Sequence, residues 1–381
     1  MRPRTEKLLT IINKILSFIS PFGRPRGALF YVHQNVWLLT GLLESSSLSL
    51  TLFFNQPFHV KAKIPVNLLF IIDPLETLKI EKDTSFLMMR EAQQRGHQVW
   101  VATPKDLKFS DDRVSISAQQ ILISDKTKIW YEVTQSKDLS SSNLDGILMR
   151  KDPPFDMEYV YSTYLLEAME KEGCRVFNRP QSIRDFNEKI AITKYPQFIV
   201  PTIVTANLTA IKHFITEQKE VVLKPLDGMG GSSVFRSRPE DPNLGVIVET
   251  LTELGCRTIM IQKFIPQISA GDKRVLLIDG EPVPYSLARI PQGSDHRGNL
   301  AAGGRGVAMA LTEREKEISS VLGPELSEKG LLLVGLDIIG DYLTEINVTS
   351  PTCMREIQDQ TGFDVPKMFI DSIEKNIGKN S

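Results

Sequence analysis

Short apolar runs alternate with longer stretches of mixed polarity along most of this chain. The runs at residues 68–72 and 99–102 contain no charged side chain, which is typical of strands buried on both faces of a parallel sheet. The stretch between them, residues 84–95, is predicted to be a helix. A further strand at 147–150 and a helix at 157–171 continue the alternation. The pattern predicts an α/β domain with a parallel sheet.

A second part of the chain begins near Lys189. Helix, strand, helix and strand are predicted there, at residues 210–217, 221–223, 244–254 and 258–264. The first of these strands ends directly before Lys224 and a glycine-rich loop. Glycines let backbone N–H groups close on phosphate oxygens without a Cβ in the way. The lysine precedes the glycines, so this is not a Walker A loop, and a glycine-rich surface turn is the alternative interpretation.

Two apolar patterns meet near the C-terminal end of the chain. Residues 331–339 are almost continuously apolar, whereas residues 342–348 alternate between apolar and polar side chains. We predict two antiparallel strands joined around Gly340 and Asp341.

Polar side chains interrupt these two strands. Glu345 and Asn347 are two residues apart and therefore share one face of their strand. A two-residue loop would place Asp337 opposite Thr344, while a three-residue loop that includes Tyr342 would place it opposite Glu345, and we favour the three-residue loop. Asp337, Glu345 and Asn347 offer the oxygen ligands that Mg²⁺ takes alongside phosphates. A solvated acidic face is the alternative, but unpaired charges are costly within apolar strands.

The glycine loop and the acidic strands together predict a site for magnesium-bound ATP. With the segments at 149–156, 289–293, 297–306 and 344–352, they resemble the bacterial-type glutathione synthetase family of ATP-grasp carboxylate–amine ligases. The resemblance runs from about Asn67 to the C-terminus. It implies an α/β chain in which an ATP-grasp fold follows an N-terminal α/β substrate domain. It also implies ligation of γ-glutamylcysteine and glycine through an acyl phosphate, giving glutathione, ADP and phosphate.

The resemblance also implies roles for individual residues. Nucleotide-binding positions are Lys189, Lys224, Gly228, Gly230, Gly231, Gln262, Lys263, Ile265 and Asp272. Catalytic positions are Arg274, Arg289 and Arg305, and substrate-binding positions are Arg150, Arg289, Arg305, Ser350 and Thr352. Metal-binding positions are Asp337, Glu345 and Asn347, with Mn²⁺ as an alternative to Mg²⁺. The strand at 258–264 would be the sheet edge that faces adenine.

Several of these residues have simpler interpretations. Lys189 also fits an exposed helix lysine, Asp272 fits a solvated loop aspartate, and any single arginine is more often part of a surface ion pair. No covalent nucleophile is predicted, because Ser232 and Ser233 lack a neighbouring histidine, as does Ser350.

The resemblance and the composition together suggest four parts. They are an appendage at 1–66, an N-terminal α/β domain at 67–188, a central and lid subdomain of the ATP-grasp fold at 189–268, and a catalytic subdomain at 269–381. Within the last, glycines and a lack of apolar bulk predict a mobile loop at 290–305 that closes over the reactive intermediate. A connector without function is the alternative for this loop.

The first 66 residues differ in composition from the rest. They hold two acidic residues against eight Lys and Arg, and no apolar run reaches the ~20 residues of a membrane span. An amphipathic anchor or a transit-like leader is one interpretation. We favour an appendage outside the fold, such as translated sequence upstream of the true start.

Charge and cysteine content limit the classes of partner. A net charge of −1 gives no field for nucleic acid. Three widely spaced cysteines disfavour a disulfide framework and fit a reduced cytoplasm. The resemblance further implies a homo-oligomer, a tetramer. Two rival functions are a sister ATP-grasp enzyme, joining D-alanine residues or adding glutamate, and a nucleotide-binding regulator without turnover.

Overall fold

The computed structural model describes residues 32–33, 36–37, 65–124, 129–292, 298–300 and 303–378. The chain divides into two compact units, Met1–Ala62 and Lys63–Ser381. In the first unit, the described residues form β1 (Val32–His33) and β2 (Val36–Trp37), which pair antiparallel. The other predictions for that segment concern residues outside the described ranges. Within those ranges, no helix is both long and apolar enough to cross a membrane.

The second unit begins with a seven-stranded sheet. Its central strands pair in parallel, in the order β4 (Gln98–Ala102), β3 (Asn67–Ile71), β8 (Gly146–Met149) and β9 (Arg175–Phe177). The sequence analysis did not predict three antiparallel strands that extend the sheet beyond β4. They are β5 (Leu107–Ser110), β6 (Arg113–Ile123) and β7 (Tyr131–Leu139). The predicted parallel sheet is therefore the centre of a mixed one.

Helices flank this sheet as the sequence predicted. They are α2 (Thr84–Gln94), α3 (Met157–Lys171) and the short α4 (Pro180–Asp185). Asp83 begins α2 and Asp156 begins α3, because each side chain accepts a hydrogen bond from a backbone N–H of the first turn. The strands carry unbroken buried runs, such as Leu68, Leu69 and Phe70 at 0 % exposure. Burial on both faces explains why this domain was predictable from apolar runs.

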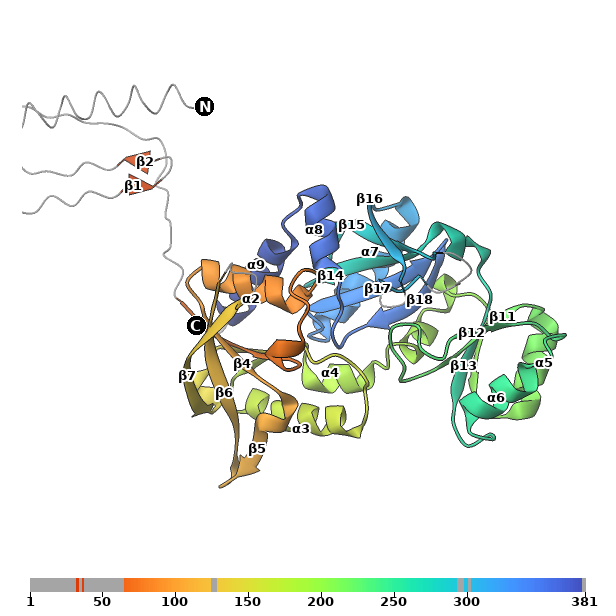
Figure 1. Cartoon of the computed structure of the whole chain (residues 1–381), viewed down its shortest axis with the longest axis horizontal. Helices are drawn as coiled ribbons and strands as arrows, with labels where there is room; N and C mark the ends of the chain where they lie inside the picture. The colour runs from red at the N-terminus through yellow and green to blue at the C-terminus, as the bar shows by residue number, and fades with distance from the viewer. Residues whose placement is uncertain are drawn as a thin grey trace, which may run out of the picture. The chain divides into compact units, whose positions relative to one another are not determined.

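A four-stranded antiparallel sheet follows in the chain. Its order is β10 (Thr202–Thr205), β13 (Ile259–Lys263), β11 (Val221–Pro225) and β12 (Phe235–Ser237). Helices α5 (Leu208–Gln218) and α6 (Leu244–Thr252) share a small core with it. In Figure 1 both helices lie at the end of this unit away from the seven-stranded sheet. The prediction that 258–264 forms a sheet edge was wrong, because β10 pairs with β13 on its outer side.

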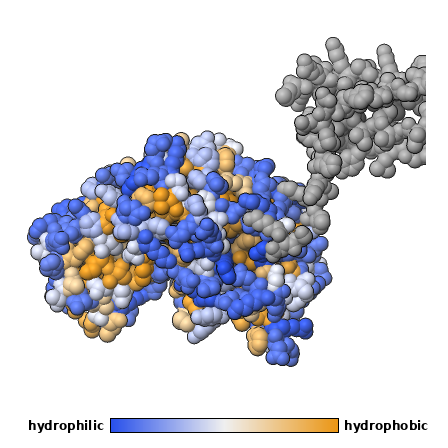
Figure 2. All heavy atoms as spheres, turned by 180° about the vertical axis from the view of Figure 1, so that it is seen from behind, coloured by the Kyte–Doolittle hydropathy of each residue, from blue (hydrophilic) through white to orange (hydrophobic). Residues whose placement is uncertain are grey.

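A five-stranded antiparallel sheet lies between the other two sheets in Figure 1. Its order is β16 (Arg305–Ala310), β15 (Glu281–Ile290), β14 (Asp272–Ile278), β17 (Leu333–Ile339) and β18 (Tyr342–Asn347). Helices α7 (Glu313–Glu328), α8 (Met354–Thr361) and α9 (Val365–Gly378) complete this part. Figure 2 shows a surface on which hydrophilic residues are interrupted by smaller apolar patches.

The hairpin β17–β18 both confirms and corrects its prediction. Ile339 pairs with Tyr342, so the loop has two residues and the three-residue loop was wrong. Asp337 nevertheless pairs with Glu345, because the register shifts between Asp337 and Ile338. This bulge makes Thr344 the extra residue of β18 and restores the predicted pairing.

Candidate active site

A cavity of about 510 Å³ is lined by residues of the four-stranded and five-stranded sheets. The first sheet contributes Lys224 from β11 and the segment 262–265 at the end of β13. The second contributes Asp272 from β14 and Glu345 from β18. Sequence positions more than a hundred residues apart therefore meet at one cavity.

The glycine loop forms one wall of this cavity. Gly228, Gly230 and Gly231 all line it. The φ angles of Gly230 and Gly231 are +63° and +79°, a region that other residues rarely adopt. The backbone conformation of the loop therefore favours glycine at these two positions.

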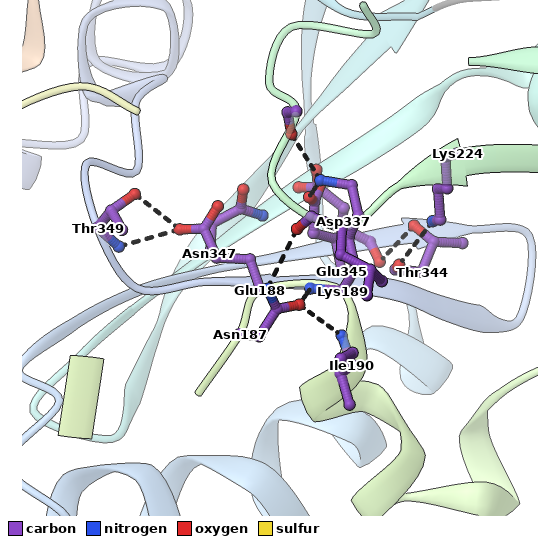
Figure 3. Close-up of polar contacts among 12 residues, drawn as sticks. Asn187, Glu188, Lys189, Ile190, Lys224, Asp337, Thr344, Glu345, Asn347 and Thr349 are labelled. Carbon is purple, nitrogen blue, oxygen red and sulfur yellow. Dashed lines mark hydrogen bonds and ion pairs between the residues drawn. The ribbon is translucent and has the colours of Figure 1, made fainter. Parts of the chain in front are cut away.

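Two lysines lie between the glycine loop and the acidic strand. Lys189 Nζ donates to Gly228 O at 2.6 Å and to Glu345 Oε1 at 2.9 Å, as Figure 3 shows. Lys224 Nζ donates to the backbone oxygen of Thr344 at 3.2 Å. Lys189 is only 5 % exposed, so the interpretation as a surface lysine was wrong.

The two ammonium groups differ in their electrostatic environment. Burial lowers the pKa of Lys224 to about 8; Glu345 opposes this shift and Lys189 adds to it. Burial also acts to lower the pKa of Lys189, but the ion pair with Glu345 outweighs it and the net shift is upward. Lys224 thus lacks a carboxylate partner of its own, and a bound anion would stabilise its charge.

Four charged side chains form a row across three adjacent strands. Arg274 on β14 donates through Nε and Nη2 to Asp337 on β17, with an Nη2–Oδ2 distance of 2.9 Å. Arg289 on β15 lies 2.8 Å from Asp337 Oδ2 and also donates to the Asp272 carboxylate. The side chain of Arg274 packs directly against Gly335 of β17. A Cβ at residue 335 would lie 2.7 Å from Arg274 Cδ, so this contact needs glycine there.

Burial and the guanidinium groups act oppositely on the two aspartates. Burial tends to raise the pKa of Asp337, but Arg274 and Arg289 hold it well below its usual range. Burial raises the pKa of Asp272 to about 6, with Arg289 lowering it and Asp337 raising it. Asp272 Oδ1 is buried without a hydrogen-bond partner. One carboxylate oxygen of this cavity-lining residue therefore has no hydrogen-bond partner among the described residues.

The predicted metal ligands fit a magnesium ion in their chemistry. Asp337 and Glu345 are paired across β17 and β18, and Asn347 lies two residues beyond Glu345. All three supply oxygen atoms. Among the described residues, no three His, Cys, Asp or Glu side chains form a metal cluster.

The predicted substrate residues are partly brought together. Arg150 follows β8, is 5 % exposed, and donates to Ser85 Oγ at 3.2 Å and to Pro351 O at 2.9 Å. Ser350 Oγ donates to Arg150 O at 3.2 Å, so these two residues are neighbours. Thr352 is exposed and contacts Cys353 Sγ at 3.8 Å.

The predicted residue Arg305 lies on an edge strand of the five-stranded sheet. It begins β16 opposite Ile290 and is exposed. It does not line the cavity described above. Its role in substrate binding therefore stays a prediction.

The predicted mobile loop at 290–305 is only partly described. Residues 293–297 and 301–302 lie outside the described ranges, so its mobility is untested. Gly298 and Asn299 line the cavity. A Cβ on Gly298 would lie 2.3 Å from Arg289 O, which makes glycine necessary for this close approach.

The segment predicted to face adenine lies at the cavity although its strand is central. Gln262, Lys263 and Ile265 all line the cavity. Gln262 Nε2 donates to Thr202 Oγ1 at 3.1 Å, which links β13 to β10. The end of β13, rather than an exposed edge, is what reaches the site.

The sequence analysis missed two residues beside Lys189. Asn187 and Glu188 both hydrogen-bond to segments that line or flank the cavity. Burial and the nearby Glu345 raise the pKa of Glu188. The available signal was that Glu188 directly precedes the predicted phosphate-binding Lys189. The partners of Glu188 are mainly backbone groups, which no sequence pattern marks.

Solved structures place this fold in a known class. The ATP-grasp ligase PsnB, in complex with a minimal precursor, Mg and ADP, matches at a TM-score of 0.52 with 14% identity, over 81% of this chain and 98% of that chain. D-cycloserine synthetase DcsG matches at a TM-score of 0.58 with 13% identity, over 81% and 99% of the two chains. The fold is that of the ATP-grasp ligases.

Sequence comparisons narrow the class to one family. Residues 66–184 match the N-terminal domain of prokaryotic glutathione synthetase, and residues 188–362 match its ATP-grasp domain. Glutathione synthetase of Nitrosomonas europaea is 52% identical over 319 residues, which are 83% of this chain and 100% of that protein. The chain belongs to the prokaryotic glutathione synthetase family and is an ATP-dependent ligase. The predicted resemblance and fold class are confirmed.

Proposed function

We propose that this protein joins γ-glutamylcysteine to glycine with ATP as the co-substrate. The cavity that brings the glycine loop and both lysines against Glu345 supports this proposal most directly. The 52% identity to a glutathione synthetase supports the choice of substrates.

The cavity offers a complementary group for each part of ATP. Backbone N–H groups of the loop 228–231 would bind the phosphates, with Lys189 and Lys224 as compact positive charges. The adenine would lie against the segment 262–265. Asp272 Oδ1 is buried and unpartnered, so it can accept a hydrogen bond from a ribose hydroxyl.

Asp337, Glu345 and Asn347 would hold Mg²⁺, or Mn²⁺ in its place. When bound, the cation neutralises charge on the phosphates. In the described structure these carboxylates pair with Arg274, Arg289 and Lys189. The same basic groups would turn to the phosphates and the substrate as the nucleotide binds.

The proposed reaction has two chemical steps. A cysteinyl carboxylate oxygen of the dipeptide attacks the γ-phosphorus, the bond from that phosphorus to the ADP oxygen breaks, and an acyl phosphate forms. The neutral amine of glycine then attacks the acyl carbon, the carbon–oxygen bond to phosphate breaks, and the amine gives up a proton. Arg274 and Lys224 would stabilise charge on the transferred phosphoryl group. The loop 290–305 would exclude water from the acyl phosphate.

The dipeptide carries two carboxylates, which suit guanidinium groups. We assign Arg150, Arg289, Arg305, Ser350 and Thr352 to its binding. Arg150 supports this assignment best, because it is buried beside Ser350.

We further expect a homo-oligomer, by family resemblance a tetramer, without a nucleic-acid partner. We place it in the cytoplasm. Cys174, Cys256 and Cys353 are all free thiols, which fits a reducing compartment.

The test measures ADP release by the purified protein with Mg²⁺, ATP and γ-glutamylcysteine, with and without glycine. D-Alanine and glutamate serve as control acceptors. We expect glycine-dependent ADP release and glutathione identified by mass spectrometry. With hydroxylamine in place of glycine, a dipeptide hydroxamate should accumulate. Nucleotide binding without turnover, or turnover with glutamate instead of glycine, would refute the proposal.

A further inference from the structure

Residues 187–189, here called the bridge segment, contact both halves of the site. Figure 3 shows the three side chains between the glycine loop and strand β18. Lys189 binds both sides directly, through Gly228 O and Glu345 Oε1. Asn187 makes a further contact to the glycine side, and Glu188 makes further contacts to the side of β18.

Asn187 fixes the glycine side of the site. Its Nδ2 donates to Leu226 O at 3.1 Å, two residues before Gly228. Its Oδ1 accepts hydrogen bonds from the backbone N–H groups of Lys189 and Ile190, at 3.2 and 3.0 Å. One side chain thus joins the start of the glycine loop to the turn that carries Lys189.

Glu188 fixes the acidic side. Its Oε1 accepts three hydrogen bonds, from Val348 N at 2.9 Å, Thr349 N at 3.0 Å and Thr349 Oγ1 at 2.7 Å. Its backbone oxygen accepts a fourth, from Ile346 N at 2.9 Å. These bonds fall on both sides of Asn347 and immediately before Ser350.

We propose that Glu188 is a positioning residue, whose carboxylate oxygen holds Val348 and Thr349 and thereby sets the end of β18, with Glu345 and Asn347, relative to Lys189. The inference rests on the proposed function, in which those residues bind the metal and the phosphates. Glu188 itself acts through the segment and does not touch the reacting atoms.

Three possible roles of Glu188 predict different effects of substitution: positioning, charge or proton transfer, and structural support alone. A positioning role needs an acceptor oxygen at the place of Oε1, and glutamine supplies one at nearly the same length. A role in charge or proton transfer needs the carboxylate itself, so glutamine would fail. A purely structural role would alter stability and leave turnover by the folded protein unchanged.

The test compares Glu188→Gln and Glu188→Ala with the wild type. Removing the oxygen leaves two backbone N–H groups and one hydroxyl without their acceptor. For Glu188→Ala we expect the Mg²⁺ concentration for half-maximal turnover to rise, or kcat to fall, by about 10–100-fold, as for other residues that orient metal ligands. For Glu188→Gln we expect the Mg²⁺ concentration for half-maximal turnover and kcat each to stay within about threefold of the wild-type value.

Asp279→Ala is the matched control. Asp279 is also one carboxylate with three side-chain donors, Ser327, Lys375 and Asn376, but it joins β14 to α7 and α9 away from the cavity. We expect this variant to lose stability and keep the wild-type Mg²⁺ dependence. Turnover is compared well below the unfolding temperature of each variant, so that unfolded protein does not count as lost activity.

Hydrogen exchange supplies a readout that does not depend on the proposed function. Backbone amides of Val348 and Thr349 should exchange faster in Glu188→Ala and at the wild-type rate in Glu188→Gln. Faster exchange with impaired Mg²⁺ dependence in Glu188→Ala alone supports the proposal. Equal impairment of both variants, unchanged exchange, or unchanged kinetics in Glu188→Ala overturns it. If the wild type makes no glutathione, the proposed function fails, and exchange still decides whether Glu188 holds the segment.

Discussion

Replacing Asp337 by asparagine should strongly destabilise the protein. Asp337 is 1 % exposed and receives hydrogen bonds or ion pairs from both Arg274 and Arg289. Asparagine is nearly isosteric, so it removes the charge and leaves the packing intact. Among the described residues, Arg289 would keep the Asp272 carboxylate, whereas Arg274 would lose its carboxylate partner. Removing one partner of a buried ion pair costs about 3–5 kcal/mol. That cost is a large part of the roughly 5–15 kcal/mol that stabilises a typical domain.

Urea unfolding at neutral pH measures this cost. The control is Asp138→Asn, which removes the same charge from an exposed pair with Lys108. We expect little change in stability for the control, because solvent screens an exposed ion pair. Adding Arg274→Met to Asp337→Asn should recover part of the loss, because it removes one uncompensated charge. A cost below about 1 kcal/mol for Asp337→Asn would show that the arginines do not depend on this carboxylate.

Three further predictions concern other groups. Glu345→Gln should raise the Mg²⁺ concentration for half-maximal turnover by about tenfold or more, and an unchanged requirement would remove Glu345 from the metal site. Burial acts to raise the pKa of Asp279, but its hydrogen bonds lower it on balance, so its stabilising contribution is present above the unfolded pKa and lost as pH falls. The stability difference between wild type and Asp279→Asn should therefore shrink between about pH 6 and about pH 3, and a constant difference would contradict the sign. Cys256 is exposed, whereas burial raises the pKa of Cys174 to about 12 and also raises that of Cys353. A thiol reagent should modify one cysteine in the folded protein and all three after denaturation, and rapid modification of a second would refute this.

The β17–β18 hairpin shows what the sequence could predict. The apolar patterns identified both strands, and the favoured three-residue loop placed Asp337 opposite Glu345, a pairing that the structure confirms. The predicted loop length was wrong because two different backbone arrangements give the same pairing of Asp337 with Glu345. A longer loop and a two-residue loop with a bulge shift the register by the same amount, and the side-chain pattern does not distinguish them.

The row of charges across β14, β15 and β17 could not be predicted in the same way. The sequence indicated that Arg274 and Arg289 serve the site, but not that both contact Asp337. That contact depends on the strand order, in which β14 lies between β15 and β17. Apolar runs predict that strands exist, whereas their order follows from long-range packing that one sequence does not encode in a local pattern.

Glu188 illustrates a limit of a different kind. Motif reasoning finds residues whose own chemistry suits a ligand, such as a lysine for a phosphate or a carboxylate for a cation. The partners of Glu188 are two backbone N–H groups and one hydroxyl, and every segment of chain offers such donors. Its importance therefore follows from where residues 346–349 lie after folding. Because Asn187 contacts the backbone at Leu226 and Glu188 contacts the segment after Glu345, this tripeptide would set the spacing between the proposed phosphate and metal ligands. Residues of this kind should be sought beside recognised binding residues, once the structure shows which backbone segments they hold.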